Sequence, residues 1–276
     1  MQINGETLLY GIIGNPVRHS LSPLMHNRAF QALGINSVYV PFPVTDVESA
    51  ITGVRGLGIG GTSVTIPHKQ SIMAFLDYID PVAEKIGAVN TIVGVQSEGR
   101  TELHGMNTDW LGANRALELE ISLAGKEVIL LGAGGSARAI GFGLIEAGAG
   151  VTICSRTEQR GRDLAAVLAC DWVSLHDVDS LSGDILVNAT SVGMHPHENA
   201  TLVAKESLCG YRVVMDIVYS PLTTRLLKEA AEAGCAIVSG LEMLLYQGVA
   251  QFELWTGRNA PVELMRDTLL NATANK

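Results

Sequence analysis

Aromatic and positively charged residues are scarce in this chain of 276 residues. Aromatics make up 5% of it, and 19 lysines and arginines face 28 aspartates and glutamates, which gives a net charge of -9. The basic residues are scattered, so the chain lacks the basic stripe that a nucleic-acid groove needs. No stretch of about 18 residues is uniformly apolar and uncharged, which argues against a membrane span.

Cysteine is also scarce, and the four cysteines never form a Cys-X-X-Cys pair. Their wide spacing argues against a zinc site and favours reduced thiols in a cytoplasm. The closest histidine pair is His195-Pro196-His197, and such a polar loop is more often solvated than metal-bound. Residues 1–10 lack the basic start and apolar run of a signal peptide. We therefore expect a cytoplasmic protein without a metal centre.

Apolar residues and glycine are abundant, at 47% of the chain and 30 residues respectively. This content rules out disorder and predicts many tight turns. At ~150 residues per domain, the length gives one large domain or two ordinary ones. Predicted strands alternate with predicted helices along the chain. This order is typical of an α/β fold with parallel strands and crossover helices.

Residues 1–106 are predicted to form a first α/β domain. A helix begins at Ser22-Pro23 and ends at Gly34, and Thr45 with Glu48 has the spacing of a capping box that opens a second helix. Two strands flank Ser97-Glu98-Gly99, the turn of a predicted hairpin. The predicted strands of this domain span residues 8–13, 38–44, 61–66, 90–95 and 101–105.

Residues 107–240 are predicted to form a second domain of the Rossmann type. A helix follows the glycine-rich turn at 132–135 and another begins at Ser220-Pro221. Residues 241–256 and 261–271 are helical in pattern, and with no strand left for a third domain they must pack on one of the other two. The predicted strands of the second domain span residues 126–131, 151–154, 184–188, 213–218 and 236–239.

The strongest local motif is Gly132-Ala133-Gly134-Gly135-Ser136-Ala137, which follows a predicted strand and opens a helix. The first glycine makes the turn, the second lets the backbone approach a pyrophosphate, and the small Ala137 lets helix and strand pack closely. The helix N-terminus supplies N–H groups for the phosphates. A glycine-rich turn without a ligand is the alternative, and the flanking strand and helix favour a dinucleotide.

The end of the next strand indicates which dinucleotide binds. It reads Cys154-Ser155-Arg156-Thr157, with Arg160 one helical turn later, and it has no carboxylate for a ribose 2′-hydroxyl. Two guanidinium groups favour a 2′-phosphate. Solvated arginines are the alternative, but cations at a helix N-terminus are unfavourable unless an anion is bound there. The motif therefore predicts NADP.

The first domain offers polar residues just beyond its strands. Ser20 and Ser22 could bind a carboxylate at a helix start, but on spacing alone simple capping by Ser22 is the better explanation. Thr65 lies near the end of a strand and Lys69 just past it, where sites of α/β proteins lie. A surface lysine and a helix cap are the simpler interpretations of Lys69 and Asp109.

Together these segments resemble the shikimate dehydrogenase family, in the family's order and over nearly the whole chain. The segments are Ser20-Leu21-Ser22-Pro23, Met25-His26-Asn27, Val64-Thr65-Ile66-Pro67-His68-Lys69, Gly87-Ala88-Val89-Asn90-Thr91, Asn107-Thr108-Asp109, Gly132-Ala133-Gly134-Gly135, residues 188–194, Asp216-Ile217-Val218-Tyr219 and residues 240–247.

The resemblance implies an NADP-dependent oxidoreductase that interconverts 3-dehydroshikimate and shikimate in the biosynthesis of chorismate and aromatic amino acids. It implies that Lys69 and Asp109 form the catalytic pair and that helices 241–276 return to the substrate domain. The implied substrate ligands are Ser20, Ser22, Thr65, Asn90, Asp109, Tyr219 and Gln247. The implied cofactor contacts are Gly132, Ala133, Gly134, Gly135, Ser136, Ala137, Ser155, Arg156, Thr157, Arg160, Thr190, Val218 and Gly240.

Two positions depart from the family pattern, because many members have asparagine where this chain has Ser63 and Ser155. The first departure puts one contact to the substrate ring in doubt. A quinate or broader quinate/shikimate dehydrogenase is one alternative, and a non-catalytic NADP-binding sensor is another. Retention of Lys69 and Asp109 argues against the sensor. The implied partner is the small-molecule substrate, and a homodimer remains open.

Overall fold

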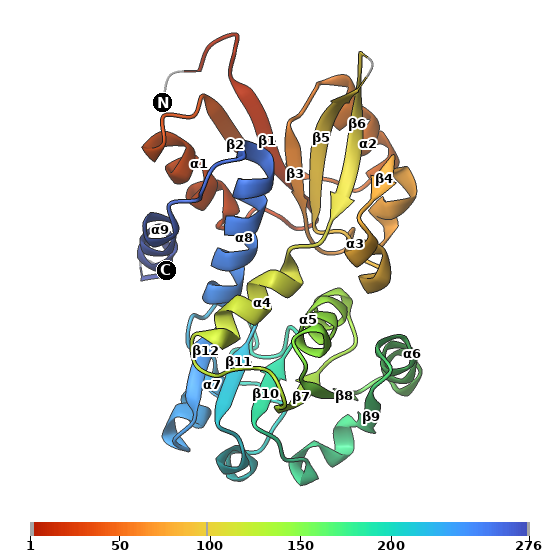
Figure 1. The fold of residues 1–276 in the computed structure, drawn as a ribbon. Coiled ribbons are helices and arrows are strands. Elements are labelled where there is room, and N and C mark those ends of the chain that lie inside the picture. Colours follow the sequence, from red (N-terminus) through yellow and green to blue (C-terminus); the bar gives the residue numbers. More distant parts are fainter. Residues whose placement is uncertain (1–2, 98, 275–276) are drawn as a thin grey trace. The chain divides into compact units, whose positions relative to one another are not determined.

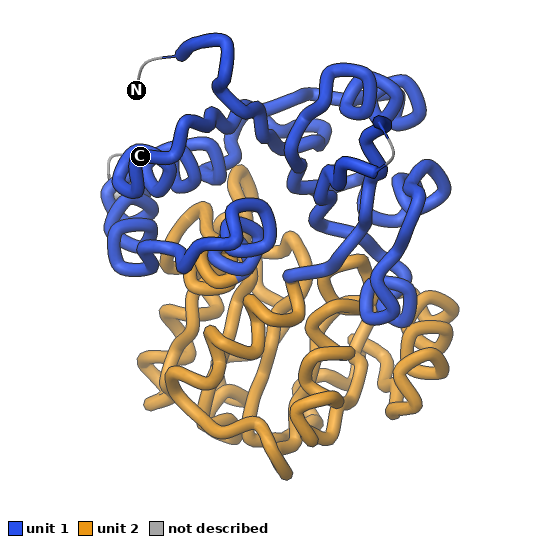
Figure 2. Tube along the Cα trace, turned by 45° about the horizontal axis from the view of Figure 1, so that its top comes forward, with its two compact units in different colours: residues 1–108, 247–276 blue, residues 109–246 orange. Residues whose placement is uncertain are grey.

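The computed structural model describes residues 3–97 and 99–274, so Glu98 of the predicted hairpin lies outside the described residues (Figure 1). The chain divides into two compact units, unit 1 with residues 1–108 and 247–276, and unit 2 with residues 109–246 (Figure 2). Each unit contains one six-stranded sheet. None of the helices in the described part of the chain has the length and apolar character that a membrane crossing needs.

The sheet of unit 1 is mixed, with the strand order β2-β1-β3-β5-β6-β4. Its strands β1, β2 and β3 are parallel, whereas β5 is antiparallel to both β3 and β6. Helix α9 packs against α1. The elements of unit 1 are β1 (Leu8–Gly14), α1 (Ser22–Ala32), β2 (Ser37–Pro43), α2 (Val47–Gly56), β3 (Gly61–Val64), the 3₁₀ helix η1 (Ser71–Phe75), β4 (Tyr78–Ile79), α3 (Pro81–Ile86), β5 (Thr91–Ser97), β6 (Arg100–Met106) and α9 (Val262–Ala274).

The strand order of unit 1 brings one end of several strands to the same sheet edge. The chain forms β2 on one side of β1 and β3 on the other, so the carboxyl ends of β1 and β3 lie side by side with a gap between their connections. Ser63 pairs with Thr91, and Thr91 pairs with Met106. The start of β5 and the end of β6 therefore lie at this edge too, together with the residues that follow β1 and β3.

Unit 2 has an all-parallel sheet with the order β12-β11-β10-β7-β8-β9. Its reversal point lies between β7 and β10, as in the Rossmann fold, because the chain builds the sheet first to one side of β7 and then to the other. The elements of unit 2 are α4 (Asp109–Glu118), β7 (Glu127–Leu131), α5 (Gly135–Glu146), β8 (Gly150–Ser155), α6 (Glu158–Leu168), β9 (Asp171–Ser174), η2 (Leu175–Ser180), β10 (Ile185–Asn188), η3 (Lys205–Gly210), β11 (Val213–Asp216), α7 (Arg225–Glu232) and β12 (Ala236–Ser239); α8 (Gly240–Thr256) continues from unit 2 into unit 1.

The α/β class and the all-parallel second sheet confirm the predicted fold. Two predicted helix starts are wrong. Asp46, not Thr45, caps α2 by accepting from Ser49 N. Helix α7 begins after Thr224, whose Oγ1 accepts from Leu227 N at 3.3 Å, and not at Ser220-Pro221.

The predicted helix start at Ser22 is confirmed, but Ser22 does not cap the helix. It is the first residue of α1, and the preceding Leu21 occupies the N-cap position, where no side chain forms a capping hydrogen bond. Capping therefore does not account for the Ser22 hydroxyl. The short elements β4, α3 and β9 are absent from the sequence prediction.

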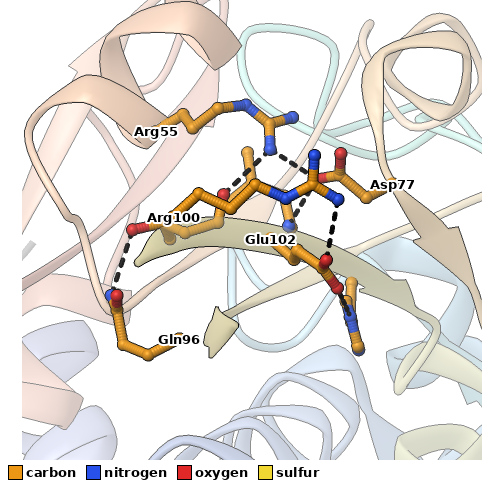
Figure 3. Close-up of polar contacts among 8 residues, drawn as sticks. Arg55, Asp77, Gln96, Arg100 and Glu102 are labelled. Atoms are coloured by element: carbon orange, nitrogen blue, oxygen red, sulfur yellow. Dashed lines mark hydrogen bonds and ion pairs between the residues drawn. The ribbon is translucent and has the colours of Figure 1, made fainter. Parts of the chain in front are cut away.

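A polar cluster holds the first residues of β6 (Figure 3). Arg55 of α2 pairs with Asp77 and donates to the Thr101 backbone oxygen at 2.9 Å, while Leu103 N donates to Asp77 at 2.7 Å. Burial alone would raise the pKa of Asp77, but these hydrogen bonds lower it below its ordinary value. The cluster fixes the first residues of β6, at the end of the strand that lies away from Met106. It thereby helps to set the register of β6 against β5, which determines where residues 106–108 lie.

His26 is fully buried in the aromatic core of unit 1. Its ring stacks on Tyr39 with centroids 4.6 Å apart and lies 5.2 Å from Trp255. Neither ring nitrogen forms a hydrogen bond of normal geometry with a described residue, although Gln251 lies near enough to favour the charged ring slightly. Burial dominates and lowers the pKa of His26 to about 3, so the ring is neutral in the folded protein near pH 7.

We expect acid to destabilise the protein through His26. Between its unfolded pKa of 6.5 and its folded pKa of about 3, the unfolded chain binds a proton that the folded ring excludes. The free energy of unfolding should therefore fall as the pH falls through this range, by at most about 1.4 kcal/mol per pH unit from this group, and the group should contribute no slope above it.

Urea unfolding followed by tryptophan fluorescence at pH 7, 6 and 5 measures this slope. His26→Phe keeps a ring in the stack and cannot take a proton, so its free energy of unfolding should depend less steeply on pH. Parallel curves for the wild type and the variant would contradict the assignment.

Candidate active site

The first turn of α1 places two serine hydroxyls at the carboxyl edge of β1. Ser22 N donates to Ser20 Oγ at 3.2 Å, so the two residues form a small turn directly before the helix. Ser22 is buried, and its side chain lies against the Tyr39 hydroxyl, where it favours the ionised phenol. Burial outweighs this effect and raises the pKa of Tyr39, so Tyr39 remains a neutral hydroxyl.

Asn90 occupies the centre of the same edge, directly before β5. Its Oδ1 accepts from Thr108 N at 2.7 Å and from Thr91 Oγ1 at 2.7 Å, and its Nδ2 donates to Thr108 Oγ1 at 3.0 Å. Asn107, next to Thr108, donates from Nδ2 to Ala88 O at 2.9 Å. These bonds join the segment after β6 to the segment before β5 and fix both backbones.

The segment after β3 carries Thr65 and Lys69 to this edge. Thr65 N donates to Ile13 O at 2.9 Å, which continues the pairing of β1 with β3 by one residue. The Lys69 backbone oxygen accepts from Val89 N at 2.8 Å, so Lys69 lies beside the residue that precedes Asn90. The Lys69 side chain is half-buried.

Asp109 and Tyr219 belong to unit 2. Asp109 is 5% exposed, begins α4, and directly follows Thr108 in the chain. Tyr219 follows β11, and burial raises the pKa of its phenol, which keeps it a neutral donor.

Helix α8 brings a distant part of the chain to the edge of unit 1. Gln251 donates from Nε2 to Thr91 Oγ1 at 3.0 Å, and Trp255, one turn later, donates from Nε1 to Ile92 O at 3.0 Å. From Gln251 to Trp255, α8 therefore runs beside β5 in the direction that leads away from the edge. Gln247 is buried and lies one turn before Gln251 on the same helix face, which places it near the start of β5 at this edge.

Unit 1 therefore brings Ser20, Ser22, Thr65, Lys69, Asn90 and Gln247 to one sheet edge. Its chemistry is one cation among neutral hydroxyl and amide groups, which suits a small, hydroxylated, anionic molecule. The sequence analysis missed Thr108, Thr91 and Gln251, which contact Asn90 or its neighbours. No group of three or more His, Cys, Asp or Glu side chains in the described residues could hold a metal ion.

The glycine-rich turn of unit 2 lies at the reversal point of its sheet. Gly132 has φ +113°, and a Cβ there would lie 2.9 Å from Thr190 Cγ2. Gly134 precedes α5 with ordinary backbone angles, and a Cβ there would meet nothing within 4 Å. No side chain caps α5, and its first turn contains no acidic residue. The turn is an uncapped helix N-terminus with an open approach, which fits a pyrophosphate.

The end of β8 exposes cationic side chains and buries a serine. Arg156, Thr157 and Arg160 are exposed. Ser155 is 4% exposed, and its Oγ accepts from Trp172 Nε1 at 3.0 Å and donates to Thr157 O at 3.3 Å. Ser155 thus holds the loop from inside, and the two arginines carry the charge that a 2′-phosphate needs.

The strand ends on the other side of the reversal point are held by Asp216. Its carboxylate accepts from Asn188 Nδ2 at 3.0 Å, Thr224 Oγ1 at 2.7 Å and Val218 N at 3.0 Å. Burial raises the pKa of Asp216 to about 6 against the lowering effect of these hydrogen bonds. Asn188 Oδ1 in turn accepts from Thr190 Oγ1 at 2.7 Å. This network fixes the backbone of Val218 and positions Thr190, which lies beside Gly132 of the glycine turn.

Comparison with known sequences finds similar proteins over nearly the full length of the chain. Residues 12–92 match the family model described as the shikimate dehydrogenase substrate binding domain, and residues 240–270 match the model described as the shikimate 5'-dehydrogenase C-terminal domain. A shikimate dehydrogenase (NADP(+)) of Methanosarcina acetivorans is 46% identical over 278 residues, which cover 96% of this chain and 98% of that protein.

Two solved structures share the fold over nearly the full length. A crystal structure of a shikimate dehydrogenase in complex with NADP+ has a TM-score of 0.92 and 41% identity, covering 99% of this chain and 98% of that one. The shikimate 5-dehydrogenase of Thermus thermophilus, in complex with NADP(H) and shikimate, has a TM-score of 0.87 and 37% identity, covering 96% of this chain and 99% of that one.

Two neighbouring glycines should respond differently to alanine. Gly132→Ala forces a left-handed backbone on a side chain that also crowds Thr190, so we expect a lower melting temperature. Gly134→Ala has room for its methyl group, so the melting temperature should stay the same while NADP binding weakens, because the methyl group blocks the approach of the phosphates. Thermal melting and calorimetric titration with NADP measure the two effects. Normal NADP affinity in Gly134→Ala would contradict this site.

Proposed function

The chain belongs to the shikimate dehydrogenase family, and from that premise we propose that unit 1 binds the substrate and unit 2 binds NADP. The enzyme interconverts 3-dehydroshikimate and shikimate. The observation that carries this proposal is the polar edge of unit 1, where the backbone hydrogen bonds of Lys69 and Thr108 hold both residues beside the segment 89–90.

The substrate contacts follow from the donors at this edge. Ser20 and Ser22 hold the carboxylate, assisted by the hydroxyl of Tyr219. Thr65, Asn90 and Gln247 bind the ring hydroxyls. Recognition of an anion by neutral donors explains how a chain with net charge -9 binds an acidic substrate, because local groups outweigh the total charge.

Lys69 and Asp109 act on the carbonyl that is reduced. When bound, NADPH supplies the hydride. The Lys69 ammonium stabilises the negative charge that develops on the substrate oxygen and transfers a proton to it, and in the reverse direction the lysine amine removes that proton. Asp109 orients the ammonium group and accepts a hydrogen bond from a substrate hydroxyl.

The residues of unit 2 fit NADP on three counts. The turn at Gly132–Ala137 leaves an uncapped helix N-terminus for the pyrophosphate. Arg156 and Arg160 bind the 2′-phosphate, with Thr157 beside them, while Ser155 supports the loop. Thr190, Val218 and Gly240 would contact the nicotinamide end of the bound cofactor.

The proposal includes the compartment and the assembly of the enzyme. All four cysteines are free thiols, which agrees with a reducing cytoplasm. A homodimer remains a prediction that light scattering of the purified protein tests directly.

The purified protein should oxidise shikimate with NADP, and turnover with quinate or with NAD should be much lower. Initial rates for the four combinations, at one salt concentration, test this. Turnover of quinate at a similar rate would instead favour a broader quinate/shikimate dehydrogenase, and binding of NADP without any turnover would favour the sensor.

Cofactor preference should depend on Arg156 and Arg160. A charge-assisted hydrogen bond contributes about 1.5–3 kcal/mol, so Arg156→Gln or Arg160→Gln should each reduce the preference for NADP over NAD by roughly 10- to 100-fold. Arg162→Gln is the matched control, because Arg162 pairs with Glu158 and lies over the Trp172 ring. An equal loss of preference in all three variants would refute the assignment.

Proton transfer should depend on Lys69. Lys69→Ala should lower kcat by about 10²–10⁴ with a much smaller change in KM for shikimate. If Lys69 and Asp109 act as a unit, adding Asp109→Asn should cost little beyond the worse single variant. Lys85→Ala removes an exposed lysine of α3 and should leave kcat unchanged. Strictly additive losses would separate the two roles.

A further inference from the structure

A row of buried polar side chains lies inside unit 1 beside the proposed substrate contacts, and Gln251 is its centre. Gln251 is 1% exposed. Its Oε1 accepts from Ser63 Oγ at 2.7 Å, and its Nε2 donates to Asn90 O at 3.2 Å and to Thr91 Oγ1 at 3.0 Å. Both hydrogens of the amide nitrogen are therefore used within the protein.

The donors and acceptors fix the direction of the hydrogen bonds that Gln251 and Ser63 form. An amide oxygen only accepts, so Ser63 must donate its one hydrogen to Gln251. Ser63 Oγ then accepts from the Tyr39 hydroxyl, at 2.6 Å. An amide nitrogen only donates, so Thr91 Oγ1 accepts from Gln251 and directs its own hydrogen to Asn90 Oδ1, at 2.7 Å.

This direction determines which side of the Asn90 amide faces the substrate. Asn90 Oδ1 receives the Thr91 hydroxyl and also Thr108 N, at 2.7 Å. In the flipped amide, Nδ2 would point its hydrogens at these two donors, which would leave buried polar groups without partners. The oxygen is therefore held toward Thr108 N and Thr91, and Nδ2, which donates one hydrogen to Thr108 Oγ1 at 3.0 Å, is the only side of the amide that can act as a donor.

We propose that Gln251 is a positioning residue that makes Asn90 a hydrogen-bond donor to a ring oxygen of the substrate. The proposal rests on the assignment of Asn90 to substrate binding in the proposed function. It also gives a role to Ser63, where the family resemblance leads us to expect asparagine. The short serine leaves space at the end of β3, and the amide group comes from α8 instead of from the strand.

The test compares shikimate binding in Gln251→Leu and the wild type. Leucine is similar in size and removes all three hydrogen bonds. By calorimetry on the enzyme without NADP, the Kd for shikimate should rise about tenfold to 100-fold, and KM should rise by a similar factor with a smaller change in kcat. The Kd for NADP should not change. Thr91→Val is a second variant that removes the hydroxyl between Gln251 and Asn90 and leaves Gln251 in place. It should also weaken shikimate binding, and it keeps the test valid if Gln251→Leu folds poorly.

Two further variants separate positioning from a general loss of stability. Trp255→Phe removes a hydrogen bond from the same helix to the same strand, one turn away from Asn90, and should lower the melting temperature without changing KM. Ser63→Asn combined with Gln251→Ala returns an amide from the strand side and should recover most of the affinity for shikimate.

A double-variant cycle identifies the residue through which Gln251 acts. If it acts through Asn90, then Gln251→Leu should add little to the loss caused by Asn90→Ala. Two results would overturn the proposal if the wild type oxidises shikimate. One is additive losses of affinity in the double variant, and the other is a lower melting temperature with a normal KM in Gln251→Leu. An inactive wild type would instead overturn the proposed function.

Discussion

Parallel pairing of β1 with β3, and of β7 with β10, is the constraint on which both sites depend. Parallel neighbours end at the same edge, and where the chain continues to opposite sides of the sheet their connections diverge. Backbone N–H groups and short polar side chains remain there without strand partners. In unit 1 the antiparallel hairpin of β5 and β6 adds its own polar ends to that edge, which an all-parallel sheet could not do. The edge of the mixed sheet therefore presents mainly polar side chains, whereas the glycine turn at the edge of the parallel sheet presents mainly backbone N–H groups.

The polar groups next to these edges are buried and almost completely paired, and this pairing gives each site its shape. In unit 2, Asp216 receives three donors from separate segments and so holds two strand ends and a helix start together. In unit 1, the amide of Gln251 has the same function for β3 and β5. A buried polar group without a hydrogen-bond partner costs free energy. Removing one member of such a network therefore destabilises the protein, because its former partners stay buried and unpaired. Such networks make the geometry of the neighbouring surface groups insensitive to small movements of the backbone.

The sequence was sufficient to predict the fold class, the glycine turn and most strands, because these depend on local periodicity and on turn chemistry. It was less reliable where two neighbouring residues could both cap a helix. Thr45 has the capping-box spacing to Glu48, yet Asp46 caps α2. The hydrogen bond from Trp172 to the hydroxyl of Ser155 could not be predicted, because Trp172 lies in a strand that the sequence did not reveal. Gln251 could not be found from the sequence at all, since 160 residues separate it from Thr91 and only the packed helix brings the two together.

The division of the chain also has a consequence for the order in which the protein folds during synthesis. Unit 2 is one continuous segment, residues 109–246, so all of its strands are synthesised before residues 247–276 of unit 1. Unit 1 is interrupted by it, and the aromatic core around His26 is completed only by Phe252 and Trp255. The first 108 residues must therefore wait, with apolar surface uncovered, while unit 2 is translated and folds. The strands of unit 2 are thus all synthesised before unit 1 has all of its parts, although residues of unit 1 come earlier in the sequence.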